Sequence, residues 1–204
     1  MNKKGIIIVF EGIDQSGKGT QAKLFIDRLK EMGLSSAYLH FHDLDTPLGK
    51  EIQLFLEGKR NYSPIVRQLL FAANRYERNE DIGDFIKSKD FIVIDRYIPS
   101  GLAYGIANGM ELDWMLEIEK QLFQPDIVVL LDITSNTSYS RKPPKDRDIY
   151  EKDLAFLEKV RDSYLGLAKK FNWLIINGED KTEEVKKSIW KGIIEELNKR
   201  GMHI

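Results

Sequence analysis

The sequence predicts an α/β fold in which helices flank a five-stranded, mostly parallel sheet. Short runs rich in β-branched residues, at 6–10, 91–94 and 127–131, have no polar face, which is typical of strands buried on both sides of a parallel sheet. Between such runs, apolar residues recur at helical spacing, as in residues 18–32. Strands that alternate with helices indicate parallel strands joined by helical crossovers.

Each element follows from its own pattern. In the helix at 18–32, apolar residues such as Phe25 and Leu29 share one face, and Gly33 ends the helix. The other expected elements are a strand at 36–41, a loop at 42–47, a helix from near Leu48, a long helix at 64–80, strands at 91–94 and 127–131, a helix marked by Leu154 to Phe171, a strand at 173–176 and a final helix marked by Val185 to Leu197. No repeat or linker interrupts them, so we expect residues 1–204 to form a single domain.

The composition excludes several classes of protein. With 31 basic and 32 acidic residues, the chain lacks the positive field that gathers a nucleic-acid polymer, so we expect no such polymer as a partner. There is no cysteine, which excludes structural disulfides and thiolate metal sites and agrees with a cytoplasmic location. The first apolar run is too short for a signal peptide, and no run reaches transmembrane length. We therefore expect no membrane partner.

A phosphate-binding motif follows the first strand. Gly12 and Gly17 bracket four residues and Lys18 comes next, which is the P-loop pattern GxxxxGK. Consecutive backbone N–H groups of such a loop surround a polyphosphate, and the lysine adds a positive charge at the β and γ phosphates. The predicted ATP-binding residues are Gly12, Ile13, Asp14, Gln15, Ser16, Gly17, Lys18, Gly19 and Thr20.

The candidate metal ligands depart from this pattern. Gly19 occupies the position where the motif has Ser or Thr, and the hydroxyl comes one residue later, at Thr20, so we expect Mg²⁺ to be held partly through water. An apolar strand that ends in an aspartate supplies the second metal ligand of a P-loop protein. Both Asp95 and Asp132 end such strands, and periodicity does not choose between them.

Residues 141–151 are dense in charge, contain two prolines and separate two helical stretches. Such a loop is usually only a solvated connection. An enzyme that transfers a phosphoryl group must also exclude water, and an arginine-bearing mobile loop is how a lid is built. We therefore predict a short mobile lid at about 141–151.

Three stretches together resemble the thymidylate kinases: Phe-Glu-Gly-Ile-Asp-Gln-Ser-Gly-Lys-Gly-Thr-Gln at 10–21, Leu-Leu-Phe-Ala-Ala-Asn-Arg at 69–75 and Asp-Arg-Tyr-Ile-Pro-Ser-Gly-Leu-Ala-Tyr at 95–104. Their order and spacing also match, over nearly the whole chain. The resemblance implies the P-loop NTPase fold as a single kinase domain, transfer of the γ-phosphoryl of ATP to dTMP with Mg²⁺, and a homodimer.

The same resemblance implies roles for individual residues. Asp14 would accept a hydrogen bond from the 3′-hydroxyl of dTMP, Phe71 would stack on thymine, and Arg75 would bond its carbonyl edge. Arg96 would bind phosphate, Tyr104 would form a wall of the pocket, and Tyr150 would crowd the 2′ position. The implied catalytic residues are Lys18, Arg96, Arg141 and Arg147, and the implied metal ligands are Asp95 and Thr20.

The chain also departs from the family pattern. No arginine lies within residues 41–49, where the family holds the acceptor phosphate, and Leu44 and Asp45 stand there instead. The phosphate is then held by Arg96 and the lid, or with help from His42 and Lys50, or the acceptor differs. Gln15, which is not basic, goes in this family with arginines supplied by the lid. The lid reads Asp-Ile-Tyr-Glu at 148–151, so its usual arginine is displaced to position 147.

Alternatives remain open at this point. Phe71 is compatible with an ordinary core position, and Arg75 with a surface pair to Glu77 or Glu80. Residues 17–21 also resemble adenylate kinase, so another nucleoside monophosphate kinase is one alternative function. A nucleotide-binding protein with a degenerate acceptor site is another. The apolar stripe Ile65, Val66, Leu69 and Leu70 fits either a dimer interface or the core.

Overall fold

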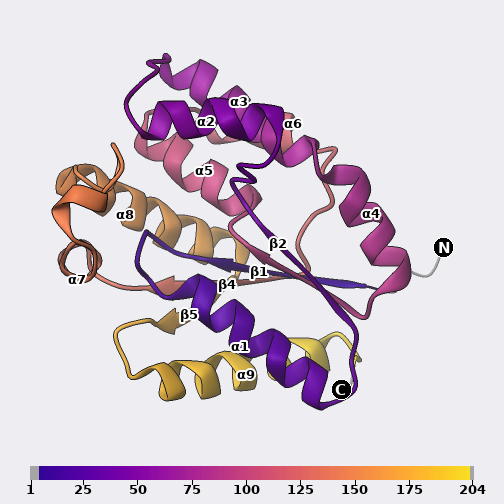
Figure 1. Ribbon diagram of the computed structural model, residues 1–204. Coiled ribbons are helices and arrows are strands. Elements are labelled where there is room, and N and C mark those ends of the chain that lie inside the picture. Colours follow the sequence, from indigo (N-terminus) through magenta and orange to yellow (C-terminus); the bar gives the residue numbers. More distant parts are fainter. Residues whose placement is uncertain (1–4, 203–204) are drawn as a thin grey trace.

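A computed structural model describes residues 5–202 of the chain, so the expected domain of 1–204 extends beyond the described residues at both ends. Its centre is a five-stranded sheet in the order β2-β3-β1-β4-β5, and every pairing is parallel (Figure 1). The strands are β1 (Ile6–Glu11), β2 (Ser36–His40), β3 (Phe91–Asp95), β4 (Ile127–Asp132) and β5 (Leu174–Asn177). The predicted α/β fold is confirmed.

Helices cover both faces of this sheet. They are α1 (Lys18–Glu31), α2 (Pro47–Leu56), α3 (Pro64–Tyr76), α4 (Asn79–Ser88), α5 (Ile98–Ala107), α6 (Leu112–Glu119), α7 (Ser135–Arg141), α8 (Leu154–Phe171) and α9 (Thr182–Lys199), with a short 3₁₀ turn at Pro144–Asp146. Helices α1 and α9 lie below the sheet in Figure 1, and α5 and α8 lie on the opposite face. No helix within the described range is both long and apolar enough to cross a membrane.

The core consists of two apolar clusters, one on each face of the sheet. Along β1, Ile7 and Val9 belong to the cluster under α5 and α8, whereas Ile8 and Phe10 belong to the cluster under α1 and α9. Successive side chains of a strand point to opposite faces, so a run without polar residues is what a doubly covered strand requires. Because β1 is the central strand, its carboxyl end lies in the middle of the row of strand ends.

The structure corrects the predicted helices at two places. The expected helix at 64–80 is two helices, since α3 ends at Tyr76 and α4 begins at Asn79. The apolar stripe continues through the break, but Glu80 and Asp81 in the first turn of α4 favour a new N-terminus there. Helices α5 and α6 were not expected; the sequence of α5 contains a proline and two glycines, which have low helix propensity.

Candidate active site

The P-loop joins β1 to α1 at the central strand. Gly12 has φ +145° and Gly17 has φ +89°, a region that favours glycine. A Cβ atom on Gly12 would lie 2.5 Å from the backbone oxygen of Leu131. Helix α1 begins at Lys18 and no side chain caps its N-terminus. Its first N–H groups are therefore available to an anion, which the positive end of the helix also favours.

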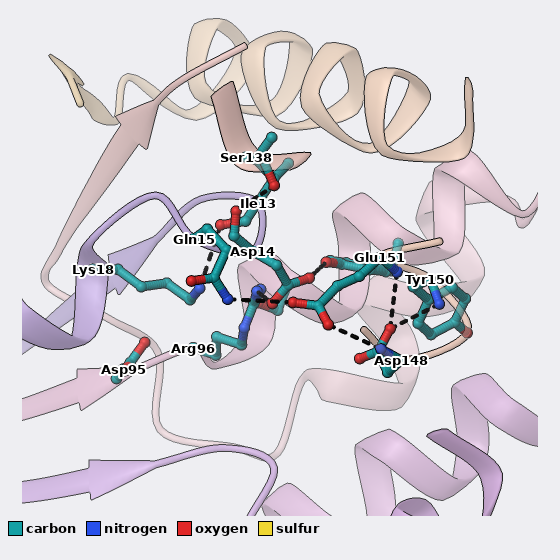
Figure 2. Close-up of polar contacts among 12 residues, drawn as sticks. Ile13, Asp14, Gln15, Lys18, Asp95, Arg96, Ser138, Asp148, Tyr150 and Glu151 are labelled. Carbon is teal, nitrogen blue, oxygen red and sulfur yellow. Dashed lines mark hydrogen bonds and ion pairs between the residues drawn. The ribbon is translucent and has the colours of Figure 1, made fainter. Parts of the chain in front are cut away.

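Lys18 lies inside this loop and is buried. Its Nζ is 3.4 Å from the backbone oxygen of Ile13 (Figure 2). Burial and the nearby charge of Arg96 lower the pKa of Lys18, while Asp14 and Asp95 act in the opposite direction. The ammonium is thus surrounded by charged groups on a loop shaped for phosphate, which agrees with the role predicted for it.

The structure distinguishes the two candidate metal aspartates. The carboxylate of Asp132 accepts two hydrogen bonds from Arg161, at 2.7 and 3.0 Å. In contrast, Oδ1 of Asp95 is buried and has no hydrogen-bond partner. A Cβ atom on Gly19 would lie 2.8 Å from Oδ2 of Asp95, so this glycine lets the carboxylate approach the start of α1. Thr20, the other predicted ligand, is exposed on α1.

The free oxygen of Asp95 fits a hard cation such as Mg²⁺, which takes oxygen ligands and is usually bound by one or two carboxylates together with substrate phosphates. Within residues 5–202 there is no group of three His, Cys, Asp or Glu side chains that could hold a metal ion by itself. The fit to Mg²⁺ therefore depends on phosphate oxygens completing its ligands.

Asp14 and Arg96 form the polar centre of the site. Arg96 Nη2 donates to Asp14 Oδ1 at 2.6 Å, and the hydroxyl of Tyr104 donates to Asp14 Oδ2 at 2.8 Å. Burial alone would raise the pKa of Asp14, but the charges of Arg96 and Lys18 hold this pKa well below its usual value. Arg96 itself has φ +64°, directly after β3. A non-glycine residue in this region needs strong local support.

That support comes from Glu11, a residue that sequence reasoning missed. It is fully buried, and it accepts hydrogen bonds from the backbone N–H groups of Tyr97 and Ser100 and from two hydroxyls, Ser100 Oγ at 2.7 Å and Tyr164 at 2.9 Å. The same two hydroxyls accept bonds from Arg96 Nη1 at 3.2 and 3.4 Å. A carboxylate at the end of an otherwise apolar strand was the available signal for this role.

Beside this centre lies a cavity of about 360 Å³, a suitable volume for one small ligand. The cavity lies between α3 and α5, beside the loop that follows β2. All six residues predicted to bind dTMP border it: Asp14, Phe71, Arg75, Arg96, Tyr104 and Tyr150. The structure thus brings together side chains from four distant parts of the chain.

The surroundings of Phe71 and Arg75 bear on the alternatives that the sequence left open, a core position for Phe71 and a surface ion pair for Arg75. Phe71 borders the cavity, with its ring 4.3 Å from that of His42, and it is not part of either core cluster. Arg75 is buried, and its Nε donates to Oε2 of Glu119 at 3.0 Å while its Nη2 contacts Oε1. The surface pairs to Glu77 or Glu80 are therefore not formed. Glu119, on the unexpected helix α6, was missed.

The two lid arginines do not border the cavity in this structure. Arg141 ends α7, and its guanidinium donates to the backbone oxygens of Gln15 at 3.0 Å and Gly178 at 3.3 Å. Arg147 is buried on the ring of Tyr139, 3.2 Å from its centroid, and donates to two backbone oxygens of its own segment. Their catalytic roles stay predictions.

Other lid residues do reach the P-loop. Glu151 accepts hydrogen bonds from Gln15 Nε2 at 3.3 Å (Figure 2) and from Lys142 Nζ at 2.5 Å. Lys142 and Asp148 border the cavity, and burial, with the charge of Asp14, raises the pKa of Asp148 to about 6. Lys142 is thus the basic residue of the predicted lid that borders the cavity, whereas Arg141 and Arg147 do not. The sequence pattern did not single out this lysine.

The residues weighed for the acceptor phosphate separate in the structure. His42 borders the cavity, and burial together with the charges of Arg96 and Arg75 lowers its pKa well below the usual value, so it is neutral near pH 7. Lys50 is exposed and does not border the cavity. Arg67 of α3 does border it, and donates to the hydroxyl of Tyr150 at 3.4 Å and to Asn108 Oδ1 at 3.0 Å. Nothing in the sequence distinguished Arg67 from a surface arginine.

Comparison with known proteins identifies the family. The thymidylate kinase family model matches residues 10–189. The chain belongs to the thymidylate kinase family. A thymidylate kinase of Arabidopsis thaliana is 34% identical, over 95% of this chain and 73% of the relative. A probable thymidylate kinase of Methanocaldococcus jannaschii is 37% identical, over 88% of this chain and 90% of the relative.

A solved structure supports the same assignment. The thymidylate kinase of Candida albicans superposes with a TM-score of 0.81 at 31% identity, over 96% of this chain and 93% of that one. Thymidylate kinases are P-loop nucleoside monophosphate kinases, so the chain is an enzyme of that class and uses ATP. Membership of the family favours the predicted function over both alternatives raised by the sequence.

Proposed function

We propose that the protein transfers the γ-phosphoryl group of ATP to dTMP and so forms dTDP and ADP. One observation carries the proposal: the Asp14–Arg96 pair joins the P-loop directly to a cavity that contains all six side chains expected for dTMP. ATP in the P-loop and a monophosphate in the cavity would place their phosphates on either side of this pair. The two substrates thus meet where the charges are concentrated.

Positioning and charge neutralisation supply the rate of such a transfer. An oxygen of the acceptor phosphate attacks the γ-phosphorus, and the bond from that phosphorus to the β–γ bridging oxygen breaks. The acceptor oxygen is already ionised near pH 7, so no general base is needed. Lys18 stabilises the charge that develops on the γ-phosphoryl and the leaving oxygen. Arg96, which is held by Asp14, Ser100 and Tyr164, orients the acceptor phosphate.

We propose that Asp95 and Thr20 hold Mg²⁺ at the start of α1, with water and phosphate oxygens as the other ligands. When bound, the ion neutralises charge on the β and γ phosphates. The support is that Oδ1 of Asp95 has no hydrogen-bond partner and that Oδ2 of the same carboxylate lies close to Gly19.

Two further parts of the proposal concern movement and assembly. Residues 141–151 act as a lid of a single kinase domain, and closure brings Arg141, Arg147 or Lys142 to the transferred phosphoryl and excludes water. The chain forms a homodimer through α3, because Ile65, Val66 and Leu69 on this helix are 52%, 45% and 45% exposed. Large apolar side chains that gather on one exposed helix face mark an interaction site. A cytoplasmic location stays a prediction.

An ATP-coupled assay with dTMP, dUMP, UMP, CMP, AMP and GMP tests the function. We expect turnover with dTMP to exceed that with the ribonucleotides, because Tyr150 is predicted to crowd the 2′ position, where a ribonucleotide carries a hydroxyl. Tyr150 borders the cavity and packs against Tyr104, with ring centroids 5.4 Å apart. ATP binding without transfer to any of the six would contradict the proposal and indicate a degenerate acceptor site. A preference for AMP would assign the chain a different substrate.

A further inference from the structure

The buried amide of Gln68 has no role in the site described so far. This side chain lies on α3 and is only 5% exposed, and it borders the cavity. Its Nε2 is buried and has no hydrogen-bond partner within the described part of the chain. A buried donor without a partner destabilises a fold, so such a group calls for an explanation. A ligand in the cavity that offers an acceptor would supply the missing partner.

The position of Gln68 on α3 indicates which part of a ligand it meets. Gln68 lies three residues before Phe71, and Arg75 lies four residues after it, so the three side chains share one face of the helix. All three border the cavity. A base that stacks on the ring of Phe71 therefore has Arg75 toward one end of the helix and Gln68 toward the other.

Helix α5 is shaped to leave room for both polar groups. A Cβ atom on Gly101 would lie 2.5 Å from Arg75 Nη2, and a Cβ atom on Gly105 would lie 2.9 Å from Gln68 Oε1. These two glycines are one turn apart, on the side of α5 that faces α3. These two glycines of α5 therefore leave room for both the guanidinium of Arg75 and the amide of Gln68.

The chemistry of the two groups specifies the base. Arg75 has donors only, and Glu119 already occupies its Nε and Nη2, so Nη1 remains for a ligand. Gln68 offers the unpartnered donor Nε2. Two donors on opposite sides of a ring match a pyrimidine with two carbonyl oxygens, as in thymine or uracil. Cytosine has a single carbonyl and presents an amino group at the other position.

We propose that Gln68 selects the acceptor base, by donating a hydrogen bond from its amide to one carbonyl oxygen of a 2,4-dioxopyrimidine while Arg75 donates to the other. The proposal rests on the proposed function, in that it assigns the cavity to the acceptor nucleotide. It adds a specificity residue on α3.

Calorimetric binding of dTMP, 2-thio-dTMP and 4-thio-dTMP tests this contact without requiring turnover. In the wild type, each thio analogue replaces one carbonyl oxygen by a weak acceptor. Gln68→Met keeps the length of the side chain but removes the amide, and Gln68→Glu keeps an acceptor but removes both donors. Gln53→Met, on the exposed face of α2 and outside the cavity, is the matched control.

We expect both Gln68 variants to bind dTMP about tenfold more weakly than the wild type, which corresponds to one neutral hydrogen bond. One of the two thio analogues should bind equally to the wild type and to Gln68→Met, because its carbonyl contact is already lost. KM for ATP should not change, and the Gln53→Met control should bind all three ligands as the wild type does.

Several results would overturn the proposal. If Gln68→Met weakens all three ligands by the same factor, the amide contacts neither carbonyl. If Gln68→Glu binds dTMP as the wild type does, an acceptor and not a donor is used. When either result accompanies normal dTMP turnover by the wild type, the base-selecting role fails and the proposed function stands. A wild type that does not bind dTMP overturns both.

Discussion

At the scale of single residues, Lys18 is buried on the P-loop and is surrounded by charged groups. We expect Lys18→Ala to lower kcat about 10²–10³-fold, because it removes one preorganised stabilising charge, and to leave the Tm nearly unchanged. Lys23→Ala, an exposed lysine on the same helix, is the control and should retain wild-type kcat. Normal kcat in a folded Lys18→Ala protein would exclude this site.

Gly19 permits a test of the metal site. We expect Gly19→Ala to raise the Mg²⁺ concentration for half-maximal activity about tenfold, because the new Cβ would lie 2.8 Å from Oδ2 of Asp95 and displace the carboxylate. Gly166→Ala is the control, since a Cβ there would meet no atom within 4 Å. A magnesium titration of both variants decides the matter. An unchanged titration for Gly19→Ala would remove Asp95 from the metal site.

Residue-level prediction from the sequence is most specific where a residue type and a spacing are tied to one chemistry. The P-loop residues, which the structure places at the junction of β1 and α1, were predicted in this way. It did not choose between Asp95 and Asp132, because only the ion pair of Asp132 with Arg161 separates them. Glu11, Arg67 and Gln68 were missed, since their roles depend on neighbours from distant segments.

At the scale of elements, the lid segment contains a carboxyl group whose ionisation depends on the fold. Burial and the charge of Asp14 raise the pKa of Asp148 from 3.8 to about 6. The folded protein therefore holds this proton more tightly than the unfolded chain does, and the contribution of Asp148 to the free energy of unfolding falls as the pH rises from about 4 to about 6.

We expect Asp148→Asn to raise the Tm relative to the wild type at pH 7, and this difference to shrink as the pH falls toward 4. An asparagine oxygen can still accept the bonds from the N–H groups of Tyr150 and Glu151, so the turn is retained. Thermal unfolding of both proteins across this pH range measures the difference. A difference in Tm that does not vary with pH would contradict the raised pKa.

The elements themselves were predictable to different degrees. Strands such as β3 are continuous apolar runs between polar ends, and all five were expected close to their observed bounds. Helix α5 was not, because Pro99, Gly101 and Gly105 weaken the local signal. Contacts outside the helix stabilise it instead: Glu11 accepts the N–H groups of Tyr97 and Ser100 at its start. A tertiary contact of this kind has no local sequence signal.

At the scale of the whole molecule, the exposed stripe on α3 predicts the state of assembly. We expect the wild type to be a dimer in solution and Leu69→Glu to be a monomer, because a charge on this face would be buried without a partner. Met32→Glu, at an exposed apolar residue beyond the end of α1, should remain dimeric. Sedimentation at several concentrations distinguishes these states. A monomeric wild type, or a dimeric Leu69→Glu variant, would exclude this interface.

The central position of β1 also affects how the chain acquires its fold during synthesis. The P-loop and β1 leave the ribosome well before both strand neighbours of β1, which are β3 at Phe91–Asp95 and β4 at Ile127–Asp132. Until Asp132 has emerged, β1 lacks one of its two strand partners, and an apolar strand in this state is prone to aggregate. Pairings between distant segments also slow folding. Nascent chains that stop before β4 should therefore be the species that chaperones bind most.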